Sequence, residues 1–100
     1  MKNEDILRML KMDLGISANA YDKYLLNLIE LSKAAIKKEG IIIPEENGSC
    51  TIEDGMLVQM YSAYLYRKRK EETASMPRSL RYALNNRLFS QKGENEQWME

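Results

Sequence analysis

The sequence predicts an all-α fold, a small bundle of four helices with one irregular loop between the second helix and the third. Apolar residues recur at i, i+3 and i+4 spacing through most of the chain, which is typical of helices that bury one face. Residues that favour helix ends interrupt this pattern, among them Gly15, Gly40 and Pro77. Charged residues make up 30% of the chain and hydrophobic residues 44%, the proportions of a globular chain. We therefore expect one small helical domain.

Helix-end signals place the first two helices. The first helix is expected to follow Asn3, a favourable N-cap, and to end at Gly15, which suits a left-handed C-cap. The second is expected to follow Asn19, because Asn19 and Asp22 have the spacing of a capping box. It ends at Gly40, after two lysines that favour the negative end of the helix dipole.

An irregular connection, "IIIPEENGSC" at residues 41–50, separates the second helix from the third. Pro44 and an Asn-Gly turn prevent this segment from growing into a strand. Thr51 is expected to cap a third helix over residues 52–70, which is apolar on nearly all sides in its middle. That pattern predicts a central helix that several neighbours contact.

A fourth helix is expected to begin at Pro77, because proline is favoured at the first position of a helix. Its apolar face repeats as far as Leu88, which places the helical domain at residues 1–90. The polar segment that follows, residues 91–100, is expected to form a flexible tail that carries Trp98.

The apolar faces of the four helices predict the core. The expected core positions are Leu7, Leu10, Leu25, Leu28, Ile29, Ile36, Leu57, Met60, Tyr64, Leu80, Leu84 and Leu88. Tyr61, Tyr64 and Tyr66 fall on different sides of the third helix, and a domain of this size is not expected to bury all three. Because tyrosine and methionine are enriched at protein interfaces, we expect the surplus aromatic surface to serve self-assembly.

Charge is unevenly distributed, although the chain is neutral overall. Residues 1–63 hold ten acidic and seven basic side chains, whereas residues 64–89 hold seven basic and two acidic ones. A local field of this size attracts an acidic protein surface or phosphates. The candidate contacts with a neighbouring subunit or with DNA are Arg67, Lys68, Arg69, Lys70, Arg78, Arg81, Tyr82, Asn85 and Arg87.

The composition argues against catalysis and against a metal or cofactor site. The chain has no histidine and a single cysteine, Cys50, so it lacks the parts of a Ser–His or Cys–His nucleophile and of a cysteine–histidine metal cage. It also lacks a glycine-rich phosphate loop and any apolar run of about 20 residues. We therefore expect no enzyme activity, no cofactor, no small-molecule substrate and no association with a membrane.

An alternative interpretation is a small helix-turn-helix DNA-binding regulator. Residues 14–29 have the residue spacing of that motif, with Gly15 in the turn between its two helices. A recognition helix needs Arg, Lys, Asn or Gln near its start to reach base edges, and here Tyr21 and Asp22 are among the first exposed positions. A capped corner between two helices explains the same residues, so the two interpretations stay open.

Four blocks of sequence carry a resemblance to a known family. They are "EDILRMLKMDLGI", "YDKYLLNLIELSKAAIKKEGI", "IEDGMLVQMYSAYLYRKRK" and "MPRSLRYALNNRLF", in that order. With them the chain resembles the head–tail connector (DNA-packaging adaptor) family of long-tailed bacteriophages and prophages. The resemblance covers roughly residues 3–90, and its most specific part is the series closed by Met76-Pro77-Arg78 and by the ending "NNRLF".

The resemblance implies a small all-helical subunit that forms a homo-oligomeric ring below the portal protein. Such a ring extends the channel for double-stranded DNA, which passes without sequence-specific contacts, and docks the next completion or tail protein. It implies a place at the head–tail junction of the virion, after assembly in the bacterial host cytoplasm, and it brings no catalytic residues. A closed ring needs two different contact patches on each subunit. The acidic first half of the chain and the basic residues 64–89 are the expected pair.

Overall fold

The computed structural model describes the backbone of residues 1–97 and the side chains of residues 1–92. The described backbone forms four helices, α1 (Asn3–Leu14), α2 (Asp22–Lys38), α3 (Ile52–Lys70) and α4 (Arg78–Gln97). Between α2 and α3 the chain is irregular, apart from an isolated bridge between Glu46 and Ser49. The predicted all-α class is therefore confirmed, and so is the irregular loop between the second and third helices.

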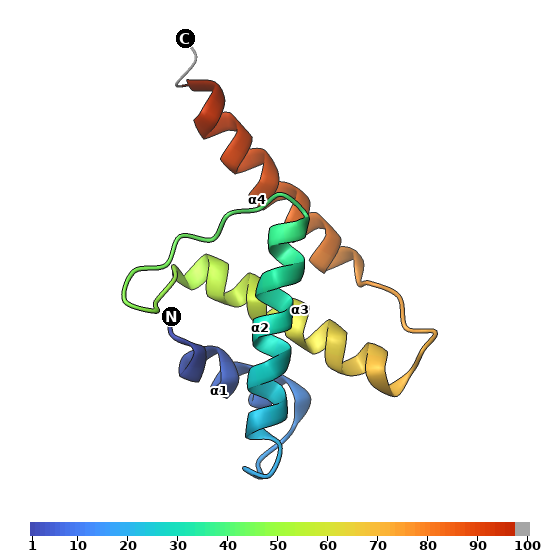
Figure 1. The fold of residues 1–100 in the computed structure, drawn as a ribbon. Coiled ribbons are helices and arrows are strands. Elements are labelled where there is room, and N and C mark those ends of the chain that lie inside the picture. The colour runs from blue at the N-terminus through green and yellow to red at the C-terminus, as the bar shows by residue number, and fades with distance from the viewer. Residues whose placement is uncertain (98–100) are drawn as a thin grey trace.

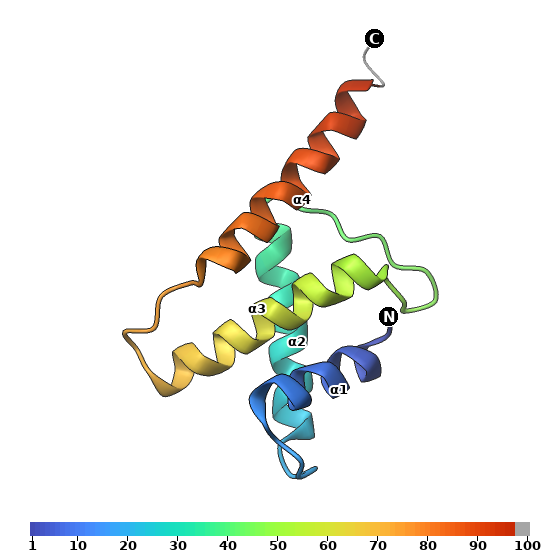
Figure 2. The same cartoon turned by 180° about the vertical axis from the view of Figure 1, so that it is seen from behind.

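The two central helices, α2 and α3, cross each other in the middle of the molecule (Figure 1). Helix α1 packs against both of them, whereas α4 packs mainly against α3. The view from behind shows the same crossing, with α3 in front of α2 (Figure 2). In both views the C-terminal part of α4 extends beyond the other helices. The predicted central role of the third helix is thus confirmed.

The core forms where α1, α2, α3 and the first half of α4 meet. Most of the expected core positions are buried, but Leu7, Met60 and Leu88 are only partly buried and pack against its edge. In α1 the fully buried side chains are Ile6 and Leu10, which share a face because they lie four residues apart. The buried apolar residues that the helical pattern did not predict are Ile6, Ile41, Cys50, Val58, Tyr61 and Ala63.

The third helix does not bury all three of its tyrosines, as expected, and of the two that it buries Tyr64 was an expected core position and Tyr61 was not. Tyr61 and Tyr64 are buried, and their rings meet edge to face with centroids 5.8 Å apart. Tyr66 is half-buried against Tyr24, with centroids 6.5 Å apart. Because neighbours cover α3 on several sides, this small domain buries more aromatic surface than its size suggests.

Three of the six predicted helix-end residues behave as expected, and Pro77, expected as the first residue of the fourth helix, lies one residue before α4 begins at Arg78. Gly15 and Gly40 adopt the left-handed conformation, with φ of 71° and 94°. The Thr51 hydroxyl accepts a hydrogen bond of 3.1 Å from the Asp54 backbone N–H, as an N-cap does. These residues set the ends of α1, α2 and α3.

The predicted N-caps Asn3 and Asn19 are wrong. Helix α1 already includes Asn3, and its first turn is closed by the Asp5 carboxylate, which accepts a bond of 3.0 Å from the Lys2 backbone N–H. That bond lowers the pKa of Asp5 below its ordinary value. Asn19 accepts a bond of 2.9 Å from Lys11 instead, and α2 begins at Asp22. Both asparagines therefore serve contacts between segments rather than caps.

Helix α4 continues to Gln97, past the boundary that the sequence predicts at residue 90. Gln91, expected in the tail, bonds to the loop after α2: it donates to the Gly40 carbonyl (2.9 Å) and accepts from the Ile42 N–H (2.8 Å). The division at residue 90 therefore does not match the end of the helix. Trp98 lies outside the described residues.

Two serines occupy the crossing point of α2 and α3. Ser32 and Ser62 are fully buried, and the Ser62 hydroxyl lies 3.0 Å from that of Ser32. Ser32 also donates to the Leu28 carbonyl, and Ser62 lies 2.8 Å from the Val58 carbonyl, so both hydroxyls are satisfied within their own helices. Their small side chains let the two helices approach closely.

Enlarging one of these serines is expected to destabilise the fold. Ser62→Leu forces extra volume into a packed crossing and should lower the free energy of unfolding by about 1–3 kcal/mol. Ser62→Ala keeps the volume and leaves Ser32 bonded to its own helix, so its effect should stay below about 1.5 kcal/mol. Urea unfolding followed by circular dichroism measures both. Equal losses in the two variants would contradict a close crossing.

Candidate protein interface

The last turn of α3 presents four of the predicted contact residues at the surface. We call Arg67, Lys68, Arg69 and Lys70 the basic end of α3, and all four are exposed. Three of these cations lie over tyrosine rings, Lys70 at 4.8 Å from the Tyr66 centroid, Arg69 at 5.5 Å from Tyr24 and Lys68 at 5.6 Å from Tyr64. The hydrogen bond with the Tyr66 side chain raises the pKa of Lys70 above its ordinary value. Ring contacts hold three of the four side chains in place, and Arg67 forms an ion pair of 3.5 Å with Asp13 of α1.

Open hollows flank the basic end. One of about 450 Å³ lies between α2 and α3 and is lined by Leu31, Ala35, Leu65, Lys68 and Arg69. A second, of about 400 Å³, shares Leu31 and Arg69 with the first. Leu31 is 48% exposed, so apolar surface lies beside these cations. Cations around apolar hollows suit a partner that carries both carboxylates and apolar side chains.

Arg81, another predicted contact, is engaged inside the chain. Its guanidinium donates to the Glu39 carboxylate at 2.7 Å, which fastens α4 to the end of α2. This hydrogen bond raises the pKa of Arg81. The Arg81 side chain remains 43% exposed, yet its charge is already paired.

Arg87 has a larger internal role, which the sequence pattern did not reveal. Its guanidinium donates to both carboxylate oxygens of Asp54, at 2.8 and 3.4 Å, and to the Ile42 carbonyl at 3.0 Å. Only 4% of the Asp54 side chain is exposed. Arg87 therefore neutralises a buried charge at the start of α3 and ties α4 to the preceding loop.

The remaining predicted residues lie on the outward face of α4. Arg78, Tyr82 and Asn85 are exposed, and Phe89, which was not among the candidates, is 73% exposed on the same face. Spacings of four, three and four residues place the four side chains along one stripe. Their contacts with a partner stay a prediction.

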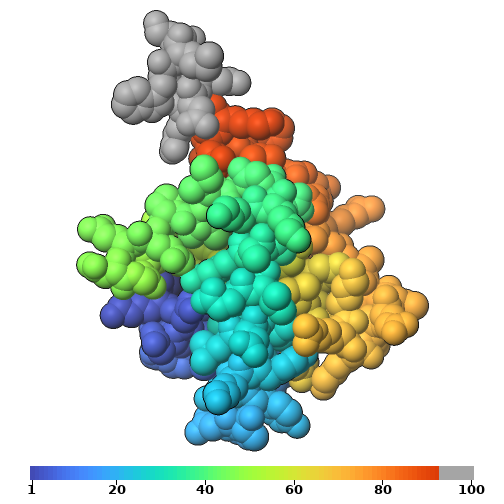
Figure 3. Space-filling view, viewed as in Figure 1, coloured from blue at the N-terminus to red at the C-terminus, as the bar shows by residue number. Residues whose placement is uncertain are grey.

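The opposite end of α3 has the opposite charge. We call the surface formed by Glu46, Ile52, Glu53 and Met56 the acidic end of α3; all four residues are exposed. Figure 3 shows the green loop before α3 and the yellow-to-orange segment around the end of α3 on opposite sides of the molecule. Although the chain is neutral overall, its acidic and basic side chains therefore form two separate charged surfaces. Sequence reasoning missed Ile52 and Met56, because exposure of an apolar residue at a helix start is not visible in its spacing.

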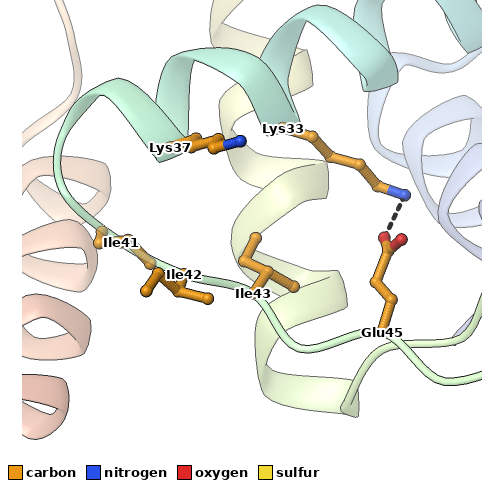
Figure 4. Close-up of a pocket in the computed structure, with 6 residues that line it drawn as sticks. All are labelled: Lys33, Lys37, Ile41, Ile42, Ile43 and Glu45. Atoms are coloured by element: carbon orange, nitrogen blue, oxygen red, sulfur yellow. Dashed lines mark hydrogen bonds and ion pairs between the residues drawn. The ribbon is translucent and has the colours of Figure 1, made fainter.

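A smaller cavity lies beneath the end of α2. It holds about 260 Å³ and is lined by two lysines of α2 and by residues of the following loop, as Figure 4 shows. Lys33 closes one side by an ion pair of 2.7 Å with Glu45 and donates to the Asn3 side chain as well. The volume falls below the roughly 300–1,000 Å³ of ordinary ligand pockets. We assign it a structural role.

The corner that suggested a helix-turn-helix is held by Lys11. Its ammonium group donates to Asn19 at 2.9 Å and to Asp22 at 2.8 Å, so one side chain of α1 fixes the turn and the start of α2. Tyr21 and Lys23 are exposed there. The capped-corner interpretation accounts for these contacts without DNA.

Within the described side chains, no group of three His, Cys, Asp or Glu residues is arranged to hold a metal ion. Over residues 1–97 no helix combines the length and the apolar character that crossing a membrane requires. Cys50 is buried, and burial raises the pKa of its thiol, which disfavours the reactive thiolate. No family model, no curated protein and no solved structure matches the chain.

Proposed function

We propose that this chain is a structural head–tail connector subunit of a phage or prophage. In this proposal many copies form a ring below the portal protein, and the ring extends the DNA channel and docks the next completion or tail protein. The subunit acts by its shape and surfaces, so the proposal assigns it no catalytic step, cofactor or small-molecule substrate. It works at the head–tail junction of the virion after assembly in the host cytoplasm.

One observation supports this function most: surfaces of opposite charge lie at the two ends of one rigid helix. Helix α3 has 19 residues and therefore separates the two ends by about 28 Å. A subunit of a ring needs two different, complementary patches on opposite sides, and this arrangement supplies them. The all-helical build also agrees with the family that the four sequence blocks resemble.

Two of the predicted contact arginines on α4 already form ion pairs within the chain, so fewer of the predicted cations are available to a partner or to passing DNA. Arg81 and Arg87 are paired with Glu39 and Asp54. Among the predicted contact residues, the exposed cations are Arg78 on the outward face of α4 and those of the basic end, of which Arg67 is also paired with Asp13 at 3.5 Å. Exposed cations of this kind suit contacts with the DNA backbone, which carry no sequence information.

Light scattering after size exclusion, together with a gel shift at physiological salt, distinguishes the connector from the alternative regulator. The proposal predicts large rings, or monomers that assemble on the portal protein, without sequence-dependent DNA binding. Ring formation should weaken as salt rises, because the proposed contacts are partly electrostatic. A stable dimer that binds one DNA sequence in preference to others would contradict the connector and support the helix-turn-helix interpretation.

A further inference from the structure

We propose that the acidic end of α3 in one copy docks on the basic end of α3 in a second copy of this chain. The inference rests on the proposed function, because it names the surfaces through which connector copies join. The start of α3 from one copy then occupies the hollow beside the end of α3 in the next copy.

Apolar surface supplies the affinity of this contact. Ile52 and Met56 are 67% and 49% exposed at the start of α3. The hollow of about 450 Å³ near the other end is lined by Leu31 and Leu65, among others. Moving the two exposed side chains into this hollow removes apolar area of both copies from water, which is favourable in proportion to that area.

Opposite charges on the two surfaces orient one copy relative to the other. Glu53 lies between the two exposed apolar residues in sequence, and Glu46 precedes them in the loop. Lys68 and Arg69 line the receiving hollow. Docking therefore brings two carboxylates toward two cations. Exposed ion pairs add little affinity, but opposite fields steer the encounter and select the register.

The two surfaces lie on opposite sides of α3 as well as at opposite ends. Nine positions separate Met56 from Leu65, about two and a half turns of helix. Each copy therefore offers one surface to the neighbour on one side and the other surface to the neighbour on the other side. A two-fold dimer whose axis passes through either charged end would place like charges together, which disfavours that arrangement. Copies join head to tail, and the chain closes into a ring when the rotation per step permits.

Charge reversal tests this contact through the dissociation constant for self-association, measured by sedimentation of the full chain at low salt. Glu46→Lys/Glu53→Lys and Lys68→Glu/Arg69→Glu each place like charges in every contact, so each should weaken association about tenfold or more. Combining the four changes in one chain restores opposite charges and should recover the association. Lys23→Glu, an exposed cation at the start of α2 that belongs to neither surface, is the control and should associate as the wild type does. Association that is unchanged in both double variants, or that the combined variant does not recover, would overturn the proposal.

Disulfide trapping tests the head-to-tail geometry. A chain carrying both Leu31→Cys and Met56→Cys should give a ladder of dimers, trimers and larger species on oxidation, whereas an equimolar mixture of the two single variants should stop at dimers. The wild type should remain uncrosslinked, because its Cys50 is buried. A single variant that crosslinks to itself would overturn the head-to-tail contact and indicate a two-fold one.

Failure of this inference is distinguishable from failure of the proposed function. Rings that form, resist both charge reversals and give no ladder would show that the copies join elsewhere, and the connector function would stand. A wild-type chain that stays monomeric from micromolar to millimolar concentration would overturn the inference, and assembly on the portal protein would then decide the function separately.

Discussion

Replacing Arg87 with methionine is expected to lower the free energy of unfolding by about 3–5 kcal/mol, the usual cost of removing one partner from a buried ion pair. Asp54, of whose side chain 4% is exposed, would be left in the interior without the guanidinium that now donates to both of its oxygens. The Ile42 carbonyl would lose a donor as well. Because small domains are stable by only about 5–15 kcal/mol, the variant should melt at a much lower temperature or fail to fold. Urea unfolding followed by circular dichroism measures the loss.

Arg78→Met is the matched control for this variant. Arg78 lies on the same helix but is exposed, and a surface substitution of this kind typically changes stability by no more than about 0.5 kcal/mol. A second variant, Arg87→Met/Asp54→Leu, removes both charges and should regain much of the loss, because an apolar pair of similar volume needs no compensation. If Arg87→Met and Arg78→Met cost the same, the ion pair does not fasten α4 to α3.

Replacing Leu84 with alanine is expected to lower the free energy of unfolding by about 2–5 kcal/mol. Leu84 is 1% exposed and, with Leu80, anchors the first half of α4 on the core. Removing its side-chain carbons loses apolar burial and leaves a cavity that the rigid helices refill only in part. Thermal and urea unfolding of the purified variant measure this effect.

Phe89→Ala is the matched control on the same helix. Phe89 is larger than Leu84 but 73% exposed, so its removal should change stability by no more than about 0.5 kcal/mol. An unchanged melting point for Leu84→Ala, or a larger loss for Phe89→Ala, would contradict the observed orientation of α4.

Local patterns predicted the helices well, because helix-forming signals lie within a few residues of one another. The span 52–70 expected for the third helix matches α3, with Thr51 as its cap. The end of α4 was missed for a physical reason. Apolar spacing stops at Leu88, but the polar residues that follow include glutamine, lysine and glutamate, which have good helix propensity without an apolar face.

Long-range partnerships were not predictable, because spacing along the chain carries no information about them. Arg87 meets Asp54 across 33 positions, and Arg81 meets Glu39 across 42. Sequence alone therefore placed both arginines with the exposed cations. The burial of Tyr61 was missed for the same reason, since it depends on how many helices surround α3.

The sequence predicted that acidic and basic residues are separated, but only the structure shows where the two charged surfaces lie. The uneven charge between residues 1–63 and 64–89 is visible in the sequence. In the structure the acidic residues around Glu53 and the basic residues around Lys68 belong to one helix, α3, and lie at its two opposite ends. The exposed Ile52 and Met56, and the hollow that would receive them, emerge from tertiary packing.

Electron microscopy of the purified chain, alone and mixed with the portal protein of the phage or prophage that encodes it, tests the central claim most directly. The connector proposal predicts closed rings of uniform subunit number, free or stacked on the portal, with a central opening wide enough for duplex DNA. Particles that remain monomers or compact dimers under both conditions, with no density added to the portal, would contradict it.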